Sequence, residues 1–284
     1  MSKIIQTKLG QIEYSIIGQG KPVVFLHGGH SNCNETLFYK GYDTTHFQLI
    51  TPSRPGYGQT PLNGHKQPKE AAKLIEAMLD QLGIHQIIVV GISAGGLTAL
   101  ELAANFPEKV TQLILISAVT KKWLTPQDKT YKRASKMFSP KREKMSWKLF
   151  RTFFTVFPRQ MTKVLFKELS SQKGQKITRE EIAAIKEMTF KQSAGEGFIT
   201  DLEQDIVPEL ITKIKCPTLI MHSKNDQSVN IAMAHHAHEK IKHSELKVYD
   251  NKWGHLLWVG EDNRQPINDL NDFLIKYNTE EKSS

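Results

Sequence analysis

A serine between two glycines, at the junction of an apolar run and a run of small residues, constrains the fold more than any other part of the chain. The sequence there is Gly91-Ile92-Ser93-Ala94-Gly95. The preceding QIIVV is typical of a buried parallel strand, and the following AGGLTALELAANF is typical of a helix. A serine on so sharp a turn needs neighbours without bulky Cβ substituents, which the two glycines provide. The pattern therefore predicts a strand, a tight turn that presents Ser93 as a nucleophile, and a helix.

The rest of the chain alternates between strand and helix patterns. Residues 11–18 and 22–28 are β-rich and flank a glycine-containing turn, which predicts a hairpin. Further strand patterns occupy 47–53, 110–118, 217–223 and 245–250, with helical patterns between most of them. From about residue 119 the strand pattern is interrupted by some 85 residues of helical character. We expect an α/β fold with a mostly parallel central sheet flanked by helices, a core of residues 1–119 and 206–284, and a helical cap at 120–205.

A serine nucleophile needs a general base, and the base needs a carboxylate that fixes its tautomer. His255 follows the strand pattern that ends at residue 250, and Asp226 follows the one that ends at residue 223. Both then lie at the carboxyl edge of the sheet, together with Ser93. Asp201 and Asp205 are the alternative acids. The sequence predicts Ser93, Asp226 and His255 as catalytic residues.

Acyl transfer also requires hydrogen-bond donors directed at the developing oxyanion. The backbone N–H of Ala94 at the start of the helix is one candidate. The second is the N–H of Gly29 in the loop His27-Gly28-Gly29-His30, which follows the strand VVFLH. We expect His27 to brace this loop rather than to act on substrate.

Aromatic residues are concentrated in the predicted cap, among them Trp147, Phe150 and Phe154. They are interpreted either as packing that holds the cap on the core or as the lining of an apolar substrate pocket, and both roles are compatible.

The net charge of +9 comes from one segment, residues 121–151, which holds eleven Lys and Arg against two acidic residues. No zinc-ligand spacing, RNA-binding aromatic signature or DNA-reading motif accompanies it, so we expect a solvated cap face and no nucleic acid.

Cys33 and Cys216 suggest no disulfide framework. The chain has no signal-peptide pattern and no apolar run of transmembrane length, which favours a cytoplasmic protein without integral membrane association. We expect no metal and no cofactor, and the oligomeric state stays open.

Taken together, the motifs HGG, GISAG and WGH and the Asp226 loop resemble the α/β-hydrolase superfamily of lid-bearing serine hydrolases, such as carboxylesterases and lipases. The resemblance covers nearly all of the chain outside the cap. The segment 53–58 also resembles the turn after the family's fourth strand, although Ser53 stands where an aspartate is usual. The resemblance implies a hydrolase that cleaves a small, hydrophobic carboxylic ester through an acyl-enzyme intermediate. The alternatives are a C–C bond or lactone hydrolase with the same triad, and a small-ligand receptor with little turnover.

Overall fold

The computed structural model of the chain describes residues 2–139, 141–193 and 195–279. Within these residues, eight strands form one sheet in the order β1-β2-β4-β3-β5-β6-β7-β8. Their bounds are β1 Lys3–Thr7, β2 Gly10–Gly18, β3 Lys21–Leu26, β4 Phe47–Pro52, β5 Ile87–Ile92, β6 Val110–Ile116, β7 Thr218–Ser223 and β8 Ser244–Tyr249. The strands from β4 across to β8 are all parallel, whereas β1 and β2 pair in the antiparallel sense. The predicted α/β fold is thus confirmed.

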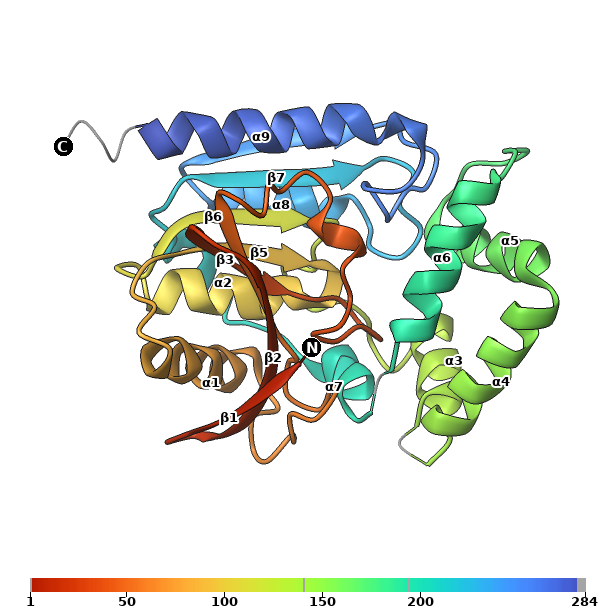
Figure 1. Cartoon of the computed structure of the whole chain (residues 1–284), viewed down its shortest axis with the longest axis horizontal. Coiled ribbons are helices and arrows are strands. Elements are labelled where there is room, and N and C mark those ends of the chain that lie inside the picture. The colour runs from red at the N-terminus through yellow and green to blue at the C-terminus, as the bar shows by residue number, and fades with distance from the viewer. Residues whose placement is uncertain (1, 140, 194, 280–284) are drawn as a thin grey trace.

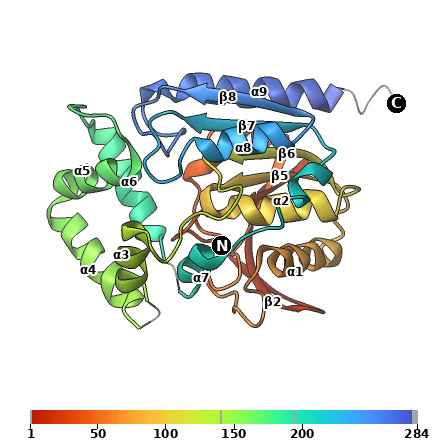
Figure 2. The ribbon, with the colours of Figure 1, turned by 180° about the vertical axis from the view of Figure 1, so that it is seen from behind.

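Helices cover both faces of the sheet, because the inner strands are apolar on both sides. Val24 and Leu26 of β3 belong to the buried cluster on one face, which also includes residues of α1 (Pro68–Gln81), α2 (Gly96–Asn105) and α8 (Ala232–Lys240). Their neighbours Val23 and Phe25 pack on the other face with α9 (Arg264–Thr279). Figures 1 and 2 show this layered arrangement from opposite sides.

The predicted hairpin of residues 11–18 and 22–28 is wrong. Although β2 and β3 are joined by a short turn, β4 lies between them in the sheet. The turn bonds instead to the segment before β4, since Gln19 donates to the Thr44 carbonyl and Lys21 to the His46 carbonyl. This pairing leaves β3 free to join β4 and β5 in parallel. Strand β1 pairs with the outer edge of β2 and was not predicted from the sequence.

Five α-helices lie between β6 and β7 in the described part of the chain. They are α3 Lys129–Met137, α4 Glu143–Val156, α5 Pro158–Leu169, α6 Arg179–Lys191 and α7 Gly197–Glu203, and we refer to them as the helical insertion. Figure 1 shows α3 to α6 as a lobe beyond the carboxyl end of β7, with α7 nearer the core. None of the helices in the described ranges is both long and apolar enough to cross a membrane.

Candidate active site

Ser93 lies on the turn between β5 and α2, in a backbone conformation that residues other than glycine rarely adopt. Its φ is +51°, and Ser93 is only 7% exposed. The neighbouring glycines are required by packing. A Cβ on Gly91 would lie 2.6 Å from the Cβ of Ala99, and one on Gly95 would lie 2.0 Å from the carbonyl oxygen of Leu26. The strand, turn and helix predicted around Ser93 are therefore present, and glycine at positions 91 and 95 permits this tight turn.

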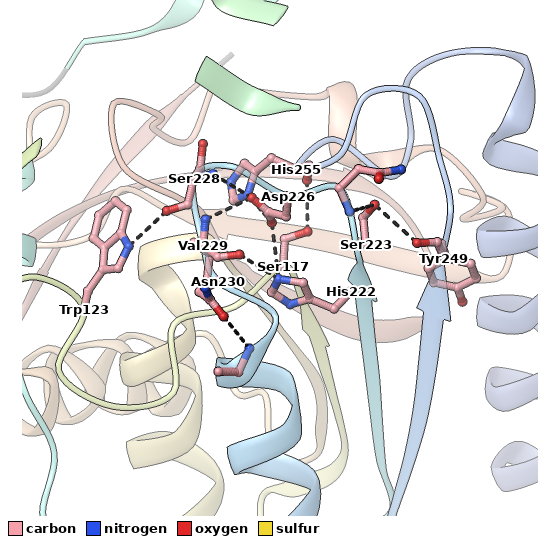
Figure 3. Close-up of polar contacts among 12 residues, drawn as sticks. Ser117, Trp123, His222, Ser223, Asp226, Ser228, Val229, Asn230, Tyr249 and His255 are labelled. Atoms are coloured by element: carbon pink, nitrogen blue, oxygen red, sulfur yellow. Dashed lines mark hydrogen bonds and ion pairs between the residues drawn. The ribbon is translucent and has the colours of Figure 1, made fainter. Parts of the chain in front are cut away.

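Asp226 and His255 are joined by a hydrogen bond at the same edge of the sheet. The Nδ1 of His255 lies 2.8 Å from the Oδ2 of Asp226, whose side chain is fully shielded from solvent. The other carboxylate oxygen accepts hydrogen bonds from the backbone N–H groups of Ser228 and Val229, at 2.8 and 2.9 Å (Figure 3). These bonds fix the carboxylate, and they orient the imidazole so that Nδ1 donates and Nε2 is left for another partner.

The segment that follows β6 connects Ser93 to His255. The Ser117 hydroxyl donates to the backbone carbonyl of His255 at 3.0 Å, and the N–H of Val119, two residues on, donates to the carbonyl of Ser93 at 2.9 Å. Ser117 and Val119 thus bond to the histidine loop and to the serine turn. The structure brings the predicted nucleophile, base and acid to one edge of the sheet.

The carboxylate of Asp226 has a second histidine beside it, which the sequence analysis did not identify. The Nε2 of His222 lies 3.4 Å from Oδ2 of Asp226 and 2.9 Å from the carbonyl of Val229 (Figure 3). Burial disfavours the anion, yet His255 and His222 together hold the pKa of Asp226 well below its usual range. The acid is therefore kept ionised by its two neighbours. The spacing of four residues between His222 and Asp226 on a strand and its following loop was the only sequence signal for this contact.

The helical insertion is bonded directly to both of these loops. The carbonyl of Leu169, at the end of α5, accepts from the N–H of His255 at 3.0 Å and from the N–H of Gln227 at 3.3 Å. Ser170 donates its hydroxyl to the carbonyl of Lys252 at 2.6 Å. Displacement of α5 would therefore disturb the histidine and acid loops.

The glycine-rich loop after β3 lies against Ser93. A Cβ on Gly28 would lie 3.0 Å from the Cβ of Ser93, and one on Gly29 would lie 2.8 Å from the ring of Phe198. The ring of His27 is fully buried beneath this loop. Its Nε2 accepts from the N–H of Arg54 at 3.0 Å, so its Nδ1 carries the proton and donates to the carbonyl of Gly28 at 2.8 Å. The expected bracing role of His27 is confirmed.

Asp201, one of the two alternative acids, has another partner. Its carboxylate forms two 2.7 Å hydrogen bonds with the guanidinium of Arg54 and accepts a 2.5 Å hydrogen bond from the hydroxyl of Tyr57. The Arg54 Nε in turn donates to the carbonyl of His27 at 2.8 Å. Burial opposes the charge on Arg54, but Asp201 raises its pKa above the usual value. Asp205, the other alternative, is exposed and caps the N–H of Ile206.

The three aromatic residues predicted to line a pocket lie at different depths of the insertion. Trp147 is 5% exposed, and its ring centroid lies 5.3 Å from that of His30 in the glycine-rich loop. Phe150 lies between Trp147 and Phe154, at 5.8 and 6.2 Å from their rings. Phe154 is fully buried in a cluster with Phe166. Trp147 is therefore the member of the set that reaches the loop beside Ser93.

The departure at Ser53 is compensated by a carboxylate from another strand. The Ser53 hydroxyl donates to Glu13 of β2 at 2.9 Å and accepts from the N–H of Cys33 at 3.1 Å. Glu13 also accepts from the N–H of Gln59 at 2.9 Å.

Burial raises the pKa of the Cys33 thiol to about 11, in keeping with a packed residue rather than a nucleophile.

The fold and this arrangement of side chains define a hydrolase of the α/β type. Residues 21–261 match the family model described as alpha/beta hydrolase fold, and the chain belongs to that family. The chain is 40% identical to the uncharacterized hydrolase YcgS of Bacillus subtilis strain 168 over 271 residues. The aligned region covers 93% of this chain and 95% of YcgS.

Two further comparisons concern a curated relative and a solved structure. The chain is 26% identical over 277 residues to the 2-hydroxy-6-oxononadienedioate/2-hydroxy-6-oxononatrienedioate hydrolase of Escherichia coli, covering 92% of this chain and 89% of that one. Its structure is similar to that of an esterase from Exiguobacterium antarcticum, with a TM-score of 0.71 and 23% identity, over 96% of this chain and 99% of that chain. The second similarity shows the fold alone.

Proposed function

We propose that the protein is a serine hydrolase that cleaves a small, hydrophobic carboxylic ester, with Ser93, His255 and Asp226 as its catalytic triad. The observation that carries this proposal is the 2.8 Å hydrogen bond from the Nδ1 of His255 to the buried carboxylate of Asp226, at the sheet edge that presents Ser93. A histidine fixed in this tautomer has its Nε2 available as a general base.

The proposed reaction has two halves. The Ser93 hydroxyl attacks the ester carbonyl and gives its proton to the Nε2 of His255, while Asp226 stabilises the imidazolium. His255 then protonates the leaving alcohol, and an acyl-enzyme remains. Water enters, gives a proton to His255 and attacks the acyl group. Collapse of the second intermediate releases the acid and returns the proton to Ser93.

We assign the oxyanion donors to the backbone N–H groups of Gly29 and Ala94. Ala94 directly follows Ser93 inside the short 3-10 turn Ser93–Gly95, and Gly28, next to Gly29, lies so close that an added Cβ would be 3.0 Å from the Cβ of Ser93. Two preorganised donors of this kind stabilise charge that develops only in the transition state.

We also propose that the helical insertion, with the bounds 120–205 predicted from the sequence, acts as a cap over this site. Ser93 and His255 are each 7% exposed, and the insertion contacts both the glycine-rich loop and the histidine loop. Substrate would then enter when the insertion moves, and water would be excluded when it closes. Trp147 and Phe150 are the proposed apolar contacts of the acyl group, with Phe154 supporting them from behind.

Hydrolysis of p-nitrophenyl esters of increasing chain length tests the proposal. Replacing Ser93 by Ala is expected to lower kcat at least about 1,000-fold, and Asp226→Asn about 1,000- to 10,000-fold. Asp205→Asn is the matched control and is expected to retain activity, because its carboxylate caps only a neighbouring N–H. A serine variant that keeps wild-type turnover would refute the proposed chemistry.

A C–C bond hydrolase is the second candidate, because the substrate in the name of the Escherichia coli relative, 2-hydroxy-6-oxononadienedioate, has no ester group and would be hydrolysed at a carbon–carbon bond beside its ketone. The same variants assayed on a vinylogous 1,5-diketone acid would distinguish the two substrates. The third hypothesis is a small-ligand receptor with little turnover. It predicts that the protein binds apolar esters but releases no product, either in a burst or in the steady state.

A further inference from the structure

The outermost face of the helical insertion exposes an apolar stripe that the proposed catalytic function does not use. Its members are Met145, Leu149, Phe153, Val156 and Phe157 of the α4 segment and Val164 of α5, each between 47% and 67% exposed. On α4 they recur at intervals of three and four residues, so they lie along one side of the helix. The opposite side of α4 buries Trp147 and Phe154. The helix therefore has two apolar faces, of which one is covered by the protein.

Basic side chains border this stripe. Lys141, Arg142, Lys144, Lys148, Arg159, Lys163 and Lys167 are all exposed. Between residues 141 and 167 the single acidic residue, Glu143, is buried. We define this stripe and its basic border as the outer face. It combines apolar area with positive charge over two packed helices.

The position of the outer face leaves it accessible to a large, flat partner. Figures 1 and 2 both show α4 and α5 at the margin of the insertion farthest from the sheet. A second copy of this chain fits the face poorly, because a twofold contact would bring the same lysines and arginines together. An anionic lipid surface supplies the complementary charge and accepts the apolar side chains at the boundary of headgroups and acyl chains.

We propose that the outer face docks the protein peripherally on anionic lipid bilayers. Leu149, Phe153 and the other apolar residues insert between headgroups, and the surrounding lysines and arginines pair with lipid phosphates. This inference concerns the side of α4 opposite Trp147 and does not depend on the proposed catalytic function.

Co-flotation with lipid vesicles tests the docking. The wild-type chain is expected to float with vesicles of equimolar phosphatidylglycerol and phosphatidylcholine and to remain at the bottom with pure phosphatidylcholine. Binding should weaken as salt is added, because exposed charges are screened. The Ser93→Ala variant should bind as the wild type does, which separates this test from that of the catalytic proposal.

Two pairs of substitutions on the outer face separate its apolar and charged contributions. Lys144→Gln with Lys148→Gln should lower the partition coefficient about fivefold for each lysine. Leu149→Ser with Phe153→Ser should lower it by about tenfold for each residue. All four side chains are exposed, so the variants should keep the wild-type Tm.

Val248→Ser with Lys242→Gln, on the core, is the matched control and should bind like the wild type. Both residues are exposed, and Val248 at 47% is as exposed as Phe153. The inference is overturned if the wild type does not float with anionic vesicles, or if both outer-face pairs float as well as the control. It is also overturned if light scattering shows a dimer that the Leu149 and Phe153 substitutions dissociate while vesicle binding is absent.

Discussion

The buried ion pair of Arg54 and Asp201 allows the sharpest stability prediction. Both side chains are only 2% exposed, and two 2.7 Å hydrogen bonds join them. Asp201→Asn would remove the charge that balances Arg54 and would replace one acceptor oxygen with a donor group. Breaking a buried pair in this way costs about 3–5 kcal/mol. For a chain of this size we expect Tm to fall by roughly 6–20 °C.

Differential scanning calorimetry measures this directly, with Asp205→Asn as the control. Asp205 is four residues away and its side chain is exposed, so its replacement should change Tm by about 1 °C or less. The double variant Arg54→Met with Asp201→Leu should lose less than the sum of the single variants, because no uncompensated charge then remains. A Tm for Asp201→Asn within about 1 °C of the wild type would refute this account of how α7 is held to the core.

Three further predictions follow from particular contacts. Gly95→Ala should abolish soluble folded protein or activity, because the added Cβ would lie 2.0 Å from a carbonyl oxygen of β3. Gly83→Ala is the control: open space surrounds Gly83, so chemical denaturation should show a loss of only about 1 kcal/mol in the free energy of unfolding. His222→Phe should lower kcat/KM about tenfold by removing a neighbour of the Asp226 carboxylate, and an unchanged value would exclude a positioning role. Burial lowers the pKa of His30 from 6.5 to about 3. Between these two pH values the unfolded chain binds more protons at His30 than the folded chain does. The free energy of unfolding therefore falls as the pH drops from 6.5 toward 3. His30→Phe should therefore flatten the decline of Tm from pH 6.5 toward pH 3, and an equally steep decline would contradict this assignment.

The sequence was most informative where a function depends on a short local pattern. The tight turn at Ser93 could be predicted because it excludes larger neighbours at Gly91 and Gly95, and this requirement is visible in consecutive residues. The placement of His255 and Asp226 at one edge of the sheet could be predicted because each follows a strand pattern, and parallel strands end at one edge.

Contacts between distant segments left little trace in the sequence. The pairing of Arg54 with Asp201 spans 147 residues, and no local pattern links the two. The carbonyl of Leu169 is a backbone group, so its two bonds to the histidine and acid loops do not depend on residue type. The hairpin of β2 and β3 was predicted wrongly for a similar reason: the turn is local, but the insertion of β4 between the strands is not.

The central claim is that Ser93 is the nucleophile activated by His255. Reaction with a fluorophosphonate followed by peptide mass mapping tests it most directly, because the reagent remains on the serine that attacks it. Ser117 provides an internal comparison, since it is also a buried serine with positive φ at the end of a parallel strand. We predict one adduct, on Ser93, whose formation is lost in His255→Ala. An adduct on Ser117, or no adduct on the folded wild-type protein, would contradict the account.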